Sequence, residues 1–114
     1  MILELPAEFH IVIPDGRRLV ILANHFKSKG NGNQDENDAL RKKQAMRVLE
    51  IYEGLRATND LIAIMGDLND SPGRDTLSPL LGEGSDLKDA SEVEGFNFAG
   101  RPGTWGDGTA QGQN

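Results

Sequence analysis

The chain has no cysteine and no long apolar run, and each absence limits what it can be. Without cysteine, disulfides and thiolate metal sites are excluded, and the redox compartment stays open. No apolar run approaches the roughly 18 residues that cross a bilayer, so no membrane span is predicted. The opening sequence MILELPAEFH lacks the basic segment and the long apolar core of a signal peptide.

Positive charge is scarce as well. Lys and Arg number 12 against 18 Asp and Glu, so the net charge is 12 − 18 = −6. Such a chain does not attract nucleic acid by its overall charge, and local basic residues or a bound cation would have to offset the repulsion. The 114 residues, 37% of them hydrophobic, suit one modest globular core.

Turn signals in the first part of the chain predict a hairpin. Residues 9–13 (FHIVI) alternate in their apolar side chains and are rich in β-branched ones. Pro14, Asp15 and Gly16 favour a turn, and residues 19–23 (LVILA) follow as a continuous apolar run. We therefore predict two paired strands, the second of which is buried on both faces between layers of structure.

A helix and a third strand are predicted next. After a Gly- and Asn-rich loop, Asn37 or Asp38 is expected to cap a helix that runs to about Ala57. Residues 61–65 (LIAIM) form another apolar strand, which ends at Gly66. This order predicts parallel strands, whose carboxyl ends share the sheet edge where ligands bind. The expected apolar stripe of the helix is Leu40, Ala45, Val48, Leu49, Tyr52 and Leu55.

The remainder of the chain carries weaker signals. Residues 76–81 predict a short helix, and residues 87–93 form a less regular segment. In the glycine-rich tail, residues 96–99 are the one strand-like stretch. The predicted fold class is α/β.

Two polar clusters lie at the predicted strand ends. The first is residues 24–29 (NHFKSK) and the second is residues 65–72 (MGDLNDSP). If the strands are neighbours, His25, Asp67 and Asn69 face one site. A carboxylate holds Mg²⁺ or orients an attacking water, an amide binds a phosphate oxygen or the water, and a histidine donates a hydrogen bond to charge that develops on phosphorus. The clusters therefore predict hydrolysis of a phosphate ester.

The order of these segments resembles a known superfamily. NHFKSK, then RKKQA in a helix, then a strand ending in IMGDLNDSP and a downstream GTW is similar to the endonuclease/exonuclease/phosphatase superfamily, typified by pancreatic deoxyribonuclease. The resemblance runs from Phe9 to Trp105. It implies a four-layer αββα sandwich, of which this chain supplies a mixed sheet and its covering helix. It also implies a Mg²⁺- or Mn²⁺-dependent hydrolase acting on a phosphoester substrate.

The resemblance also assigns the site residues. Asn24 and His25 match a strand-end Asn-His pair, whose histidine contacts the scissile phosphate. Asp67 and Asn69 match the GDxN motif of the catalytic centre, and both are candidate metal ligands. The role of the aspartate is water activation, metal binding or both.

Other parts of the superfamily pattern are structural or missing. Arg41 and Gln44 match a helix signature that we interpret as structural, and Thr104 and Trp105 match a segment that precedes a second catalytic aspartate in relatives. The principal metal-binding glutamate and the final Asp-His pair have no candidate here. Residues 1–114 are thus expected to form an incomplete domain, inactive or weakly active, whose exposed apolar sheet face favours self-association.

More than one function remains open. A nuclease-like phosphodiesterase is favoured, because NHFKSKG most resembles bacterial nuclease-like members. Phosphomonoesterases and phosphoinositide or sphingomyelin phosphoesterases are alternatives, since one centre serves many substrates. The acidic net charge favours a small phosphoester over tightly bound DNA. An alternative from another functional class is a non-catalytic remnant or interaction module that keeps the sheet without a complete active site.

Some residues have simpler interpretations. His10 has no partner cluster and is interpreted as an ordinary strand residue. Asp70 is interpreted either as part of the site or as a loop residue that bonds to nearby backbone. Trp105 is expected to pack a loop rather than to stack on a base. Five basic residues have two equally supported interpretations, a patch that attracts phosphate or an ordinary solvated surface. They are Lys27, Lys29, Arg41, Lys42 and Lys43.

Overall fold

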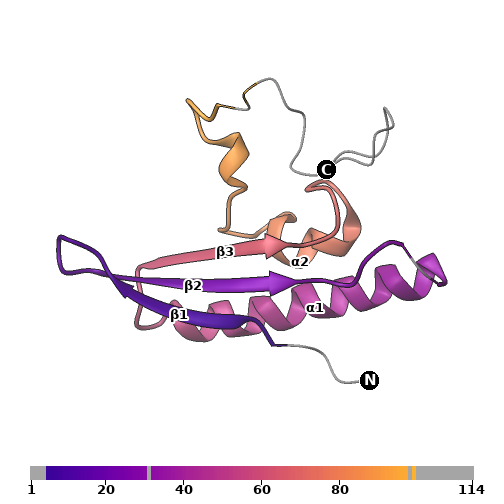
Figure 1. Cartoon of the computed structure of the whole chain (residues 1–114), viewed down its shortest axis with the longest axis horizontal. Coiled ribbons are helices and arrows are strands. Elements are labelled where there is room, and N and C mark those ends of the chain that lie inside the picture. Colours follow the sequence, from indigo (N-terminus) through magenta and orange to yellow (C-terminus); the bar gives the residue numbers. More distant parts are fainter. Residues whose placement is uncertain (1–4, 31, 98, 100–114) are drawn as a thin grey trace.

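A computed structural model describes residues 5–30, 32–97 and 99 of the chain. Its main elements are strand β1 (Ala7–Val12), strand β2 (Arg18–His25), helix α1 (Gln34–Leu55) and strand β3 (Leu61–Asp67). The three strands lie side by side, and α1 runs along them (Figure 1). Two short 3₁₀ helices and a short α-helix follow: η1 (Asp75–Leu77), α2 (Ser78–Leu81) and η2 (Ala90–Glu92). The predicted α/β class is confirmed.

The sheet is mixed, with the strand order β1-β2-β3. β1 pairs antiparallel with β2, and the turn between them closes with hydrogen bonds from Ile13 N–H to Arg17 O and from Gly16 N–H to Ile13 O. Gly16 has a φ of +90°, which is why a glycine suits this turn. β2 and β3 are parallel neighbours, joined through α1. The predicted hairpin and parallel crossover are both confirmed.

Helix α1 begins earlier than the sequence suggested. Its N-cap is Asn33, whose side chain accepts a hydrogen bond from Glu36 N–H at 3.1 Å. The predicted cap at Asn37 or Asp38 is therefore wrong, because Asn33 already satisfies a free donor of the first turn. The helix ends at Leu55, two residues before the predicted end near Ala57.

The buried face of α1 changes character along its length. Its second half is mostly apolar and packs on a core that includes Leu22 and Phe26, together with Leu77 and Leu80 from the short helices. Its first half is polar. The buried residues of the helix are Asn37, Arg41, Gln44, Ala45, Val48 and Tyr52. Of the predicted apolar stripe, Ala45, Val48 and Tyr52 are buried, and Leu49 and Leu55 pack against the core. Leu40 is not part of the core, and the sequence did not predict the polar part of the buried face.

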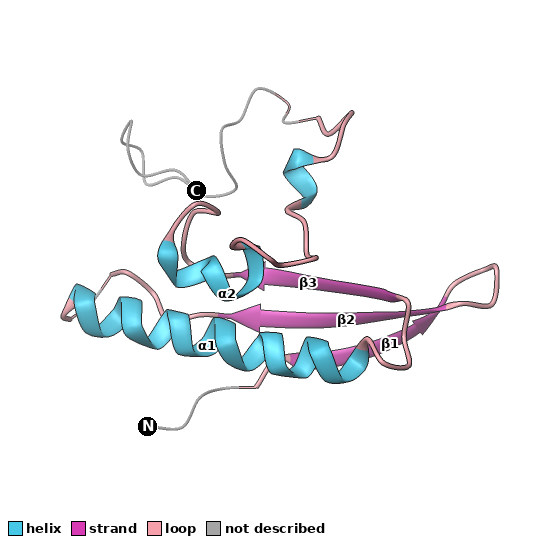
Figure 2. Ribbon diagram, turned by 180° about the vertical axis from the view of Figure 1, so that it is seen from behind, coloured by secondary structure: helices cyan, strands magenta, loops and turns pink. Residues whose placement is uncertain are grey.

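The sheet is covered on one face only in the described part of the chain. α1 lies across that face (Figure 2), and the β2 residues Val20 and Leu22 are fully buried there. The prediction that β2 is buried on both faces is wrong, because its alternate residues are only half-buried. By strand alternation the uncovered face, called the open face below, is apolar. Its apolar residues are Ala7, Phe9, Ile11, Leu19, Ile21, Ala23, Leu61, Ala63 and Met65, and His25 and Asp67 end the same face.

The predictions for the weaker segments were partly correct. The helix expected at residues 76–81 is present as η1 followed directly by α2. Residues 87–93 contain only the 3₁₀ turn η2, and residues 96, 97 and 99 are not part of a strand. Among the described residues, no helix has both the length and the apolar stretch that a membrane crossing needs.

Candidate active site

The predicted site residues His25 and Asp67 are register partners at the ends of the parallel strands β2 and β3. Neighbouring strands are about 4.8 Å apart, so the two residues are adjacent. The strand ends are also joined beyond this pair, because Phe26 N–H donates to Asp67 O at 2.8 Å. Both His25 and Asp67 are exposed. A carboxylate and an imidazole are thus open to solvent at one sheet edge.

Asn69 is hydrogen-bonded both to the end of β3 and to the segment that follows β2. Its backbone N–H donates to Asp67 Oδ1 at 3.0 Å, and its side-chain Nδ2 donates to Phe26 O at 2.7 Å. Its φ of +52° lies in the left-handed region, which asparagine tolerates better than most residues. The GDxN spacing therefore has a local cause: the aspartate orients the turn, and the asparagine ties the turn to the segment after β2.

The side chain of Asn24, unlike those of His25 and Asp67, is held by hydrogen bonds to strand backbone. Its Nδ2 donates to Leu22 O at 3.0 Å and more weakly to Met65 O at 3.4 Å. The side chain is half-buried and bridges the main chains of β2 and β3. Its amide NH₂ group thus supports the strand ends that present the neighbouring His25.

Asp70 is a buried carboxylate beside this site. Its side chain accepts hydrogen bonds from Ser71 N–H at 2.9 Å and Thr76 Oγ1 at 2.5 Å, and Lys29 Nζ lies 3.1 Å away. Burial raises the pKa of the Asp70 carboxyl, but the hydrogen bonds from Thr76, Ser71 and Lys29 outweigh burial and hold its pKa below the usual value. The local backbone bond expected for Asp70 is present, within a larger network.

The five basic residues do not form a uniform patch. Arg41 is fully buried, so it is not part of an exposed surface. Lys29 pairs with Asp70, and Lys42 pairs with Asp75 at 3.0 Å. These contacts partly neutralise the positive charge that the sequence places near the site.

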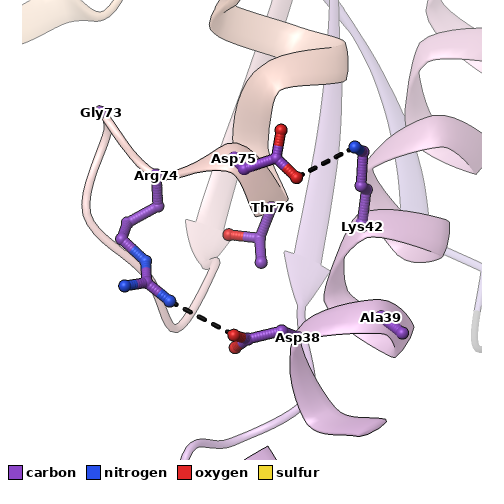
Figure 3. Close-up of a pocket in the computed structure, with 7 residues that line it drawn as sticks. All are labelled: Asp38, Ala39, Lys42, Gly73, Arg74, Asp75 and Thr76. Carbon is purple, nitrogen blue, oxygen red and sulfur yellow. Dashed lines mark hydrogen bonds and ion pairs between the residues drawn. The ribbon is translucent and has the colours of Figure 1, made fainter. Parts of the chain in front are cut away.

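A hollow of about 440 Å³ lies between the start of α1 and the segment after β3 (Figure 3). It is crossed by the Lys42–Asp75 ion pair and by Arg74 Nη2, which is 3.3 Å from Asp38 Oδ2. Its lining residues are Asp38, Ala39, Lys42, Gly73, Arg74, Asp75 and Thr76. None of the four predicted site residues lines it, so we place the candidate site at the exposed strand ends instead.

The donors at the strand ends fit part of a magnesium shell. Asp67 contributes a carboxylate and Asn69 an amide oxygen, both of which Mg²⁺ accepts. No group of three or more His, Cys, Asp or Glu side chains suited to a metal ion exists within the described residues. Mg²⁺ often binds through one or two protein carboxylates, with water and substrate phosphates completing the shell. The fit is therefore partial, and affinity for the metal alone is expected to be weak.

The buried network of Arg41 and Asp70 was not predicted. A sequence signal existed, since Arg41 lies four residues before Ala45 on the helical stripe, where a charged residue must find partners. Thr104 and Trp105, and with them the expected packing of Trp105, lie outside the described residues. Comparisons with family models, curated proteins and solved structures found no match for this chain.

Proposed function

We propose that this chain carries part of the catalytic centre of a metal-dependent phosphoester hydrolase. The observation that supports the proposal best is the pairing of His25 with Asp67 at adjacent parallel strand ends, with Asn69 tied to both segments. Carboxylate, amide and imidazole groups at one exposed edge are the side chains that phosphate ester hydrolysis uses. The motif order resembles nuclease-like phosphodiesterases of the endonuclease/exonuclease/phosphatase superfamily.

Each residue has a role in this proposal. His25 donates a hydrogen bond to a phosphate oxygen on which negative charge develops. Asp67 would hold the metal, accept a proton from the attacking water, or do both, and Asn69 would offer the metal a neutral oxygen ligand. When bound, Mg²⁺ or Mn²⁺ polarises the phosphoryl oxygen and offsets its charge. Asn24 holds the strand ends in place.

The open face is consistent with the four-layer sandwich of that superfamily, in which a second sheet would cover it. We propose a phosphodiester as substrate class, with a nucleic acid as one source. The net charge of −6 favours a small phosphoester over tight binding to a polyanion. Self-association through the open face is part of the same proposal.

One observation favours a second candidate function. The described residues contain no group of three or more acidic, His or Cys side chains able to hold a metal. A non-catalytic interaction module that keeps the sheet would need no such group. Metal binding at the strand ends separates the two functions.

The test is Mn²⁺ titration followed by nuclear magnetic resonance, since a paramagnetic ion broadens signals near its site. We expect broadening centred on His25, Asp67 and Asn69. Asp67→Ala should abolish it. Asp60→Ala is the matched control, because Asp60 is also an exposed aspartate but precedes the opposite end of β3. Broadening that survives in Asp67→Ala would refute the proposed centre.

Hydrolysis of a generic aryl phosphodiester with Mn²⁺ complements this measurement. We expect weak turnover that Asp60→Ala retains and Asp67→Ala loses. Equal turnover by both variants would assign the activity to a contaminant or to another part of the chain. Localised Mn²⁺ binding without turnover would mean that the donors present bind metal but do not suffice for catalysis.

A further inference from the structure

Arg41 is the largest fully buried side chain among the described residues, yet the proposed chemistry does not use it. Burying a guanidinium group costs free energy unless its donors find partners. Replacing a buried ion pair with apolar side chains of similar volume is often neutral or even stabilising. Packing alone therefore does not account for an arginine at this position of α1.

The contacts of Arg41 join three segments. Nη1 donates to Lys27 O at 3.0 Å, just after β2. Nη2 pairs with Asp38 on α1 itself. Nε lies 3.4 Å from Asp70 Oδ2, just after β3, in an ion pair whose geometry is not that of a hydrogen bond. One planar side chain thus connects both strand-end segments to the helix.

Neighbouring contacts hold the same stretch of backbone. Gln44 Oε1 accepts from Lys27 N–H at 2.8 Å, so α1 binds both polar main-chain groups of Lys27. Phe26 N–H donates to Asp67 O, and Phe26 O accepts from Asn69 Nδ2. All four polar main-chain groups of two consecutive residues are therefore occupied, two by α1 and two by the end of β3 and the loop after it.

We propose that Arg41 is a positioning residue of the candidate site. By donating to Lys27 O and to Asp38 while its Nε is ion-paired with Asp70, it fixes the segment that carries His25 relative to the segment that carries Asn69. The fork geometry of a guanidinium can satisfy two separate acceptors at fixed angles, which an ammonium group does less well. This role rests on the proposed function, because it matters for the chemistry only if the two segments form one site.

The experiment compares Arg41→Lys and Arg41→Met with Arg47→Met. Arg47 is the matched control, since it lies on the same helix but is exposed and pairs with Glu50 on the helix surface. Three quantities are measured for each variant: the urea midpoint of unfolding, native-state amide exchange at Lys27 relative to Val20, and Mn²⁺ affinity from broadening of the Asn69 amide signal. Val20 reports on the buried centre of β2.

We expect Arg41→Lys to stay folded while amide exchange at Lys27 rises about tenfold or more relative to Val20. Mn²⁺ affinity should fall about tenfold, the size of effect that residues supporting metal ligands usually have. Arg47→Met should change neither quantity. If Arg41→Met does not fold, Arg41→Lys decides, because it keeps a buried cation.

A purely structural role predicts a different pattern. Both Arg41 variants would then lower the urea midpoint but leave relative exchange at Lys27 and Mn²⁺ affinity unchanged, and that result would overturn the positioning role. Absence of Mn²⁺ broadening in the unmodified chain would instead refute the proposed function. The exchange measurement does not depend on metal, so the two failures are distinguishable.

Discussion

The backbone of Gly66 passes so close to Asn24 that a Cβ atom at position 66 would lie 2.1 Å from the Asn24 carbonyl oxygen. Gly66 also has a φ of +119°, a conformation that residues with side chains rarely adopt. The strand ends that carry His25 and Asp67 therefore approach in this way only because residue 66 is a glycine.

Gly66→Ala should reduce the free energy of unfolding by about 3 kcal/mol, because both the positive φ and the close contact become strained. Urea unfolding measures the change. Gly54→Ala is the control: Gly54 lies in α1 with nothing within 4 Å of its built Cβ, and alanine there should stabilise by about 0.5–1 kcal/mol. Equal midpoints for Gly66→Ala and the unmodified chain would contradict this account.

Asp70→Asn should lower the free energy of unfolding by about 3 kcal/mol at neutral pH, because it removes the buried partner of a buried guanidinium. Arg41 would lose a carboxylate 3.4 Å away, and Lys29 one 3.1 Å away. Chemical denaturation tests the value. Asp75→Asn is the control, since the Asp75 carboxylate is exposed and its pair with Lys42 should contribute little. Similar losses for both variants would argue against a special role for Asp70.

The contribution of Asp70 should also depend on pH in a defined direction. Its pKa in the folded chain is below the usual value, so folding favours the ionised form. The stabilisation is therefore fully present above the ordinary aspartate pKa of about 3.9 and is lost as the pH falls through the lower folded value. The difference in free energy of unfolding between the unmodified chain and Asp70→Asn, measured with urea, should be constant down to about pH 5. It should shrink below about pH 4. A difference that grows with acid would be inconsistent with a depressed pKa.

The open face should make the chain self-associate. Ile11 is 43% exposed on this face, whereas the adjacent Val12 is 70% exposed on the opposite face of the same strand. Ile11→Lys should therefore shift the chain towards monomer in sedimentation velocity, because it places a charge within the apolar surface. Val12→Lys adds the same charge outside that surface and should leave association unchanged. Monomeric behaviour of the unmodified chain at high concentration would refute the prediction.

Magnesium should hardly change thermal stability. Two protein donors leave most of the shell to water, so a dissociation constant of about 10 mM is a reasonable scale. At about 1 mM Mg²⁺ such binding adds less than about 0.1 kcal/mol and shifts Tm by less than about 1 °C. Calorimetry with and without Mg²⁺ checks this, with Ca²⁺ as an ionic control. A shift of several degrees specific to Mg²⁺ would mean that further ligands complete the shell.

Local signals in the sequence were enough to predict most of the elements. The Pro14–Gly16 turn, the apolar runs of β2 and β3 and the helical stretch between them led to the correct hairpin and parallel crossover. The sequence placed His25 and Asp67 at one edge only on the condition that their strands are neighbours, and the structure shows that β2 and β3 are paired. The helix start was missed, since asparagine or aspartate occurs at 33, 35, 37 and 38 and propensity alone does not select one cap.

The sequence by itself determined the order and direction of the strands, because turn chemistry and apolar periodicity act between residues close in the chain. Only the tertiary structure decided that Arg41 is buried against Lys27 and Asp70 and that Asn24 bridges two strands. Each of these depends on partners far apart in the sequence. Hydropathy describes a residue's own preference for water, whereas burial of a charge is decided by the groups that the fold brings to it.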